Sequence, residues 1–453
     1  MAKAAKRMAP EPTVYIRLRN HFGLAPGHLP VLKEQFAHYE RPNLQLALDA
    51  LLKEPGRSSS SVGLVSSAWE EPSLARLSRP ATAKGFHEGP VEYVDVALAN
   101  DQQLACVMRT LILFQDDGQP VALLIQDERH SHPKSISVEI MGGERETAEK
   151  ILRLLTRNTR HGLAFRGHVL SIEQDCYHSL VVKFHRLPEI GRKEIILPEA
   201  LLERIERHTI SFSRHAERLR AARRHLKRGI LMFGPPGTGK TLSAMYLAAQ
   251  MPGRSVILIT GQAMGAIEIA CRLARMLEPA TVILEDADLI GTERGHQTVG
   301  ANALLFELLN QMDGLAEDAD VLFILTTNRP DVLEPALASR PGRIDQAIEV
   351  PLPDADCRRR LIDLYGQGLQ LKISRMDQLL RRLEGVSAAF IRELLRKSAV
   401  YAAESQSDDK PLCVKDEHIT EALGDLLVTG GSLTQSLLGA KQEPTSQSKK
   451  SDA

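Results

Sequence analysis

The chain has 453 residues, of which 43% are hydrophobic and 25% are charged, close to the average globular protein. Its 57 Lys and Arg are balanced by 57 Asp and Glu, so it lacks the cationic excess with which proteins that coat nucleic acid neutralise phosphates. The five cysteines lie far apart without any CxxC pair, which predicts free thiols in a reducing compartment. We found no leader-like or membrane-length apolar run, so the sequence predicts a cytoplasmic protein that does not contact membranes.

The first 194 residues predict two regions. Apolar residues at helical spacing predict a helical segment over about residues 13–53, and the turn-rich stretch KEPGRSSSS at 53–61 closes a first region, 1–60. Region 61–194 combines short β-type runs with one amphipathic helix, at about 144–157, and predicts a small α+β domain. The expected strands are 94–99, 110–114, 121–125, 136–140, 168–172 and 180–184. No motif in either region predicts a catalytic site.

The second half has a different organisation. From residue 195 to 352 apolar strands alternate with helices, a pattern that predicts an α/β fold with a parallel sheet covered by helices. Residues 353–428 predict helices only. The last stretch, 429–453, is rich in Ser, Gln and Lys and predicts a disordered tail.

A phosphate-binding loop is predicted at residues 234–241. The apolar strand 229–233 runs into GPPGTGKT, which matches the pattern GxxxxGK[ST], and a helix is expected directly after it. Glycines let backbone N–H groups surround phosphates, while Lys240 reaches the outer phosphates and the Thr241 hydroxyl binds Mg²⁺. The residues predicted to bind a nucleotide are Gly234, Pro235, Pro236, Gly237, Thr238, Gly239, Lys240, Thr241 and Leu242.

Two carboxylates predict hydrolysis in addition to binding. The apolar strand 281–284 is followed at once by Glu285 and Asp286. Ligands bind at the carboxyl ends of strands in open α/β sheets, and phosphoryl transfer to water needs one group that holds Mg²⁺ and one that orients the water. The alternative interpretation is a solvated turn after a buried strand.

Three further side chains fit the same reaction. A second buried strand, 321–325, leads into Asn328, whose amide could position the attacking water. Arg340 and Arg343 follow and could stabilise charge in the transition state. Surface ion pairs are the alternative role for both arginines.

Taken together, these motifs resemble the AAA family of ATPases. The resemblance covers about residues 195–427 and is carried by GPPGTGKT at 234–241, ILEDAD at 283–288, TTN at 326–328 and LEPALASRPGRID at 333–345. It implies a P-loop α/β domain with a C-terminal helical lid, and ATP and Mg²⁺ as cofactors. It also implies a homo-oligomeric ring, usually a hexamer, in which Arg340 and Arg343 act on the ATP of the neighbouring subunit.

The acid pair departs from the family pattern, which usually has Asp before Glu. By position, Glu285 would hold the metal together with Thr241, and Asp286 would polarise the water. An Asp in that role is one methylene shorter, and a misplacement of about 1 Å can cost on the order of a hundredfold in rate. The reversed order is similar to that in the group containing the mitochondrial Rieske-protein translocase, although the membrane anchor of that group is not expected here.

Two other departures concern client handling and the lid. Segment 261–265 (GQAMG) has no aromatic residue where many family members carry a loop that grips peptides. In the lid motif, Phe390 stands where the family has Asp, with Ile391, Leu394 and Leu395 continuing at helical spacing.

Three functions remain open from the sequence. The leading one is an ATP-driven motor that remodels or disassembles a protein client, and the second is a slow, nucleotide-gated scaffold. The third, a nucleic-acid-stimulated motor, rests on residues 214–228, which contain seven Lys or Arg and one Glu. A solvated helix face with Leu219 and Leu226 pointing inward explains the same run, and the balanced net charge favours a protein client.

Overall fold

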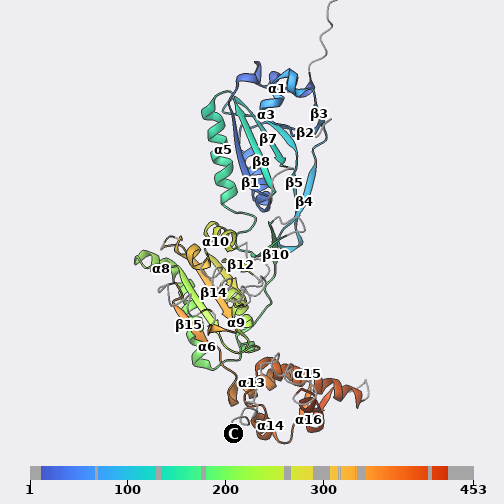
Figure 1. The fold of residues 1–453 in the computed structure, drawn as a ribbon, viewed down its shortest axis with the longest axis vertical. Coiled ribbons are helices and arrows are strands. Elements are labelled where there is room, and N and C mark those ends of the chain that lie inside the picture. Colours follow the sequence, from blue (N-terminus) through green and yellow to red (C-terminus); the bar gives the residue numbers. More distant parts are fainter. Residues whose placement is uncertain are drawn as a thin grey trace, which may run out of the picture. The chain divides into compact units, whose positions relative to one another are not determined.

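The computed structural model (Figure 1) describes residues 12–66, 70–128, 134–174, 180–259, 267–288, 307–314, 316, 318–331, 333, 343–406 and 411–426. The chain divides into two compact units, Met1–His185 and Arg186–Ala453, each with its own strands and helices. None of the described helices combines the length and apolar character that crossing a membrane requires.

The first unit is built on a six-stranded antiparallel sheet in the order β1-β8-β7-β6-β2-β3. Its strands are β1 (Val31–Ala37), β2 (Ser59–Ser66), β3 (Phe86–Gly89), β6 (Thr110–Asp116), β7 (Gln119–Asp127) and β8 (Ser135–Gly142). Two further antiparallel pairs are β4 (Tyr93–Ala97) with β5 (Gln103–Val107), and β9 (Val169–Gln174) with β10 (Leu180–His185). The predicted strands of this region are therefore confirmed.

Helices cover both faces of this sheet, so the central strands are buried on both sides. One apolar cluster joins the sheet to α2 (Arg41–Leu52) and α5 (Arg145–Arg160), and includes Leu48 and Ile151. A second cluster, on the opposite face, joins the sheet to α1 (Thr13–Phe22) and α3 (Leu74–Leu77). The short helix α4 (Pro80–Ala83) follows α3 in the chain. The predicted amphipathic helix is confirmed as α5.

The expectation of helix across residues 13–53 is wrong at β1. Leu32 and Phe36 pack on the cluster that contains α2 and α5, while Val31 packs on the opposite cluster. A spacing of four residues, as between Leu32 and Phe36, fits one helix face as well as one strand face. Pairing with β8 over Val31–Ala37 decides in favour of the strand.

The second unit contains the predicted parallel sheet. Its strands are β11 (Arg228–Phe233), β12 (Ser255–Ile259), β13 (Ala280–Leu284), β14 (Val321–Thr327) and β15 (Gln346–Glu349), in the order β12-β13-β14-β11-β15. All four pairings are parallel. Its helices are α6 (Glu199–Glu206), α7 (Phe212–Arg214), α8 (Ala216–Ala221), α9 (Lys240–Ala249) and α10 (Ile267–Met276). Because the strands are parallel, their carboxyl ends lie along one edge, where the predicted site residues follow them.

A helical lid ends the second unit (Figure 1). Its helices α13 (Ala355–Tyr365), α14 (Met376–Arg382), α15 (Ala388–Glu404) and α16 (Asp416–Gly424) surround one apolar cluster. The predicted apolar face of α15 is confirmed, since Phe390, Ile391, Leu394 and Leu395 are all buried. The prediction of helices only is incomplete, because β16 (Gln370–Lys372) and β17 (Cys413–Lys415) form a short parallel pair.

Candidate functional site

The loop between β11 and α9 depends on glycine at three positions. Gly234, Gly237 and Gly239 have φ values of 146°, 75° and 94°, which side-chain-bearing residues rarely adopt. A Cβ on Gly234 would lie 2.3 Å from the carbonyl oxygen of Val350. These glycines therefore allow the tight turn that delivers the chain into α9 directly at Lys240.

The Lys240 side chain lies inside this loop and is only 5% exposed. Its Nζ donates hydrogen bonds to the carbonyl oxygens of Gly234, at 2.9 Å, and Pro235, at 2.8 Å. Burial lowers the Lys240 pKa, while the negative charges of Asp286 and Asp288 oppose that shift. The loop thus holds one buried cation close to the acids that follow β13.

The remaining loop residues surround this lysine. Thr238 is buried, and its hydroxyl donates to the carbonyl of Pro235 at 2.9 Å. Thr241 and Leu242 occupy the first turn of α9 and are exposed, Leu242 to 40%. Helix N-termini attract anions because their first N–H groups are unpaired, so the exposed turn at Thr241 is accessible to a phosphate group.

Glu285 directly follows β13 and carries a buried oxygen. Its Oε1 has no hydrogen-bond partner within the described part of the chain. Burial, and in addition the charge of Asp286, raises the Glu285 pKa. A buried carboxylate oxygen without a donor is costly, and a hard cation with oxygen ligands would satisfy it.

Asp286 and Asp288 are both tied to the end of β14. The Asp286 backbone has a φ of 46°, its N–H donates to Thr326 Oγ1 at 3.2 Å, and its Oδ1 accepts from Asn328 Nδ2 at 3.2 Å. Asp288 Oδ1 accepts from the Thr327 hydroxyl at 2.7 Å and from the Asn328 N–H at 3.1 Å. The fold therefore brings Asn328 against the acids, and it places their charges near Lys240.

Arg343 lies apart from this cluster. It forms an ion pair with Asp313, and its Nη1 is buried with no partner among the described residues. Its backbone is held against β11, because a Cβ on Gly229 would meet the Arg343 carbonyl oxygen at 2.2 Å. Arg340, the loop 261–265 and the tail 429–453 lie outside the described residues.

The sequence reasoning missed several residues that shape the site. Asp288, itself held by the Thr327 hydroxyl, sets the position of Asn328, and Thr326 accepts a hydrogen bond from the Asp286 N–H and so positions Asp286. From the lid, the Ala389 N–H donates to the carbonyl of Gly237 at 3.1 Å. The Ser387 hydroxyl caps α15 by accepting from the Phe390 N–H at 3.2 Å. A Ser directly before a helix is a recognisable N-cap signal. That signal predicts where α15 begins but not that it meets the phosphate loop.

Comparison with known proteins assigns this region to a family. The model of the "ATPase family associated with various cellular activities (AAA)" matches residues 230–352. An ATP-dependent zinc metalloprotease FtsH 2 from Sphaerobacter thermophilus is 32% identical over 225 residues, which are 47% of this chain and 34% of that protein. A proteasome-activating nucleotidase from Thermococcus onnurineus is 31% identical over 222 residues, covering 46% of this chain and 54% of that protein.

A third relative is the 26S proteasome regulatory subunit S10B homolog B of Arabidopsis thaliana, 32% identical over 195 residues, or 40% of this chain and 48% of that protein. The chain thus spans between about a third and about half of these relatives. The glycine loop, the buried Lys240 and the unpaired Glu285 oxygen fit a polyphosphate with a divalent cation. Residues 230–352 therefore form an ATP-hydrolysing P-loop domain of the AAA family, whose cofactors are ATP and Mg²⁺.

Proposed function

We propose that this protein is a motor that uses ATP hydrolysis to remodel or disassemble a protein client. The proposal rests mainly on the hydrogen bond between the Asn328 amide and the Asp286 carboxylate, whose charge acts on the buried Lys240. A loop that only stores nucleotide needs no such acid–amide pair beyond its phosphate site.

Each residue then has one role. Lys240 and the N–H groups of the glycine loop bind the outer phosphates, and Mg²⁺ supplies charge neutralisation where Thr241 and Glu285 would hold it. Asp286 accepts a proton from the attacking water, and Asn328 orients it. The hydrogen bond of 3.2 Å between Asn328 Nδ2 and Asp286 Oδ1 supports this division, because it holds the two groups that act on the water in one place.

The protein client is proposed from the relatives. They are described as a protease, a proteasome-activating nucleotidase and a proteasome regulatory subunit, all of which concern proteins as substrates or partners. Segment 261–265 has no aromatic residue, so the client would be moved without an aromatic grip. Action in the cytoplasm remains our prediction for the whole protein.

The hydrolytic assignment is tested by steady-state ATP turnover of wild type, Glu285→Gln and Asp286→Asn. Both variants should lose at least about a hundredfold in kcat, because each removes a group used in the transition state. Asp331→Asn is the matched control, since Asp331 is an exposed acid paired with Arg329. Wild-type turnover no faster than that of Glu285→Gln or Asp286→Asn would support the slow scaffold instead.

We further propose a homo-oligomeric ring, as a hexamer, in which Arg343 and Arg340 contact the ATP of the neighbouring subunit. Arg343 belongs to no cluster with Lys240 or Asp286 in its own chain, and its Nη1 lacks a partner within the described part of the molecule, which supports a role toward another subunit. Mixing Lys240→Ala with Arg343→Ala subunits should restore part of the activity, because some interfaces then carry both intact groups. Absence of any restoration would exclude action between subunits.

A nucleic-acid-stimulated motor is the second candidate, because Arg223 and Arg224 are exposed before β11. Other residues of the run 214–228 have structural roles: the Arg228 guanidinium stacks 4.1 Å from the Phe212 ring, and Lys227 donates to the Met312 carbonyl. Leu226 is buried and Leu219 partly so, in line with a solvated helix face. An ATPase rate that rises with added DNA or RNA, and falls in Arg223→Ala/Arg224→Ala, would favour this candidate over the protein remodeller.

A further inference from the structure

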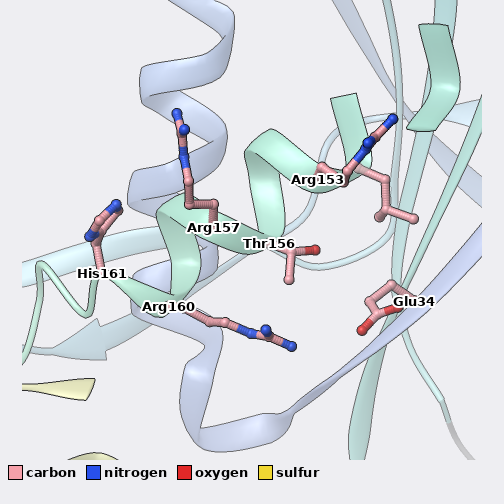
Figure 2. Close-up of a pocket in the computed structure, with 7 residues that line it drawn as sticks. Glu34, Arg153, Thr156, Arg157, Arg160 and His161 are labelled. Atoms are coloured by element: carbon pink, nitrogen blue, oxygen red, sulfur yellow. The ribbon is translucent and has the colours of Figure 1, made fainter. Parts of the chain in front are cut away.

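A basic groove lies in the first unit, lined by α5 and β1 (Figure 2). It has a volume of about 500 Å³. The lining residues are Glu34 from β1 and Leu152, Arg153, Thr156, Arg157, Arg160 and His161 from α5 and the residue after it. Figure 2 shows the Arg160 guanidinium directed toward the side of the groove where Glu34 lies. Three arginines against one glutamate make the groove strongly cationic.

The arginines are not needed to hold α5 in place. The helix packs through Ala148, Ile151 and Leu155, which are fully buried, whereas Arg153, Arg157 and Arg160 are exposed. Arg153 contacts Glu149 of its own helix at 3.5 Å. Within the described residues, no ion pair is formed by Arg157 or Arg160. Repulsion between unpaired cations on one helix face is unfavourable, so an anionic partner would relieve it.

An edge strand lies beside these arginines. β1 is the terminal strand of the six-stranded sheet and pairs only with β8 among the described strands. Its other side carries backbone N–H and C=O groups that an extended peptide can pair with. The stretch from Arg153 to Arg160 rises about 10 Å along the helix, about the length of three residues of a strand. Acidic side chains along an added strand would therefore match the arginine spacing.

We infer that this groove binds an acidic, extended segment of a protein partner, whose backbone adds to the free edge of β1 and whose carboxylates pair with Arg157 and Arg160. The binding of an acidic segment stands independently of the proposed function. The identification of this partner as the protein that the motor remodels rests on the proposed function. Glu34 favours a peptide over nucleic acid, because a peptide can place an uncharged residue near Glu34 while a nucleic acid has a phosphate at every step.

The termini of this chain do not fit the groove. Residues 1–11 contain three basic residues and one acid, and residues 427–453 contain three lysines and two acids. Both segments are net basic and would be repelled by the arginines. A segment of another protein is therefore a better occupant than either of these two stretches.

The test uses the full chain without nucleotide and a fluorescein-labelled peptide of alternating Glu and Val, followed by fluorescence anisotropy. Saturable binding is expected for this peptide and not for one of alternating Lys and Val. Arg157→Glu/Arg160→Glu should weaken binding at least about tenfold, because two favourable pairs become repulsive. Arg145→Glu, on the same helix but outside the groove, should change affinity less than about twofold. Equal binding by the double variant would overturn the inference.

Two further comparisons separate the parts of the inference. Glu34→Gln should tighten binding about twofold, because it removes the one like charge in the groove, and a weakening would contradict the proposed placement. A Glu–Val peptide methylated at every backbone nitrogen, which has no backbone N–H to donate, should bind at least about tenfold more weakly; equal affinity would overturn strand addition. Tighter binding of single-stranded DNA that the arginine reversals abolish would assign the groove to nucleic acid instead.

Failure of this inference and failure of the proposed motor give different results. An ATPase that hydrolyses normally but binds no acidic peptide refutes the groove alone. A chain that binds the peptide through Arg157 and Arg160 but never turns over ATP refutes the motor alone. The reversals are on exposed residues, so an unchanged thermal unfolding midpoint confirms that each variant is folded.

Discussion

The two units use sheets of opposite construction, and their candidate sites differ accordingly. In the second unit all strands are parallel, so Glu285 after β13 and Asn328 after β14 come to the same edge as the phosphate loop after β11. In the first unit neighbouring strands are antiparallel, and residues that follow them are divided between the two edges. The charged groups that gather there lie along one helix, α5, beside an edge strand.

This difference sets how each site should respond to mutation. The ATPase site depends on buried or partly buried groups held by several elements, where removal of one partner leaves others uncompensated. The α5 groove depends on exposed arginines, and each exposed ion pair contributes about 0.2–1 kcal/mol. Single substitutions should therefore disable the first site, whereas the second should need several.

The largest effect is expected for Lys240→Ala. Because Lys240 is the buried cation of the phosphate loop, its loss should lower kcat/KM for ATP about a thousandfold or more. Binding of the acidic peptide should stay within about twofold, since the groove is in the other unit. Lys227→Ala, which removes an ammonium bound to the Met312 carbonyl, is the control for charge. Near wild-type turnover in Lys240→Ala would contradict the assignment.

Asn328→Ala should come next, with kcat reduced about a hundredfold and KM for ATP nearly unchanged. The amide contacts Asp286 and acts on the water rather than on the bound nucleotide, so the effect should appear in the chemical step. Steady-state kinetics at saturating ATP measures this. A change in KM alone would mean that Asn328 serves binding and not hydrolysis.

Gly237→Ala should have an intermediate effect, through the contact between loop and lid. A Cβ on Gly237 would lie 2.7 Å from Ser387 Oγ and 2.9 Å from the Ala389 Cβ, in addition to the strain at a φ of 75°. We expect about 2 kcal/mol of lost stability and a clear loss of ATP affinity. Gly253→Ala is the matched control, because Gly253 has a φ of 82° with nothing within 4 Å. Equal losses in both variants would show that the lid contact contributes nothing.

The smallest effect, and the only stabilising one, concerns the melting temperature of Glu285→Gln rather than its turnover. Burial raises the Glu285 pKa above its ordinary value of 4.5, so the folded state holds this proton more tightly than the unfolded chain does. Ionising the group therefore costs stability as the pH rises above about 4.5. Without nucleotide at neutral pH, Glu285→Gln should raise the melting temperature by about 2 °C, and the gain should disappear near pH 4. Glu349→Gln, at an exposed acid of β15, should show no such gain.

The parallel sheet and the phosphate loop were readable from the sequence for physical reasons. Continuous apolar runs such as β14 indicate strands that are buried on both faces. The glycines before Lys240 occupy positions with positive φ, where other residues would be strained. By contrast, the sequence predicts helix at β1, because the spacing of Leu32 and Phe36 fits both a helix and a strand. Only the pairing with β8 distinguishes the strand from the helix.

The sequence by itself determined the chemistry of the ATPase domain. Gly234, Glu285 and Asn328 each follow a strand of one parallel sheet directly, and Lys240 begins the helix after the glycine loop, so motif order along the chain predicts the site. Tertiary structure alone determined which residues from distant segments contact the site. Asp288 reaches Asn328, and Ala389 reaches Gly237, only through packing between segments distant in sequence. From the sequence alone, the α5 arginines predict only a solvated helix face. The tertiary structure shows that they line a groove with Glu34 of the edge strand β1.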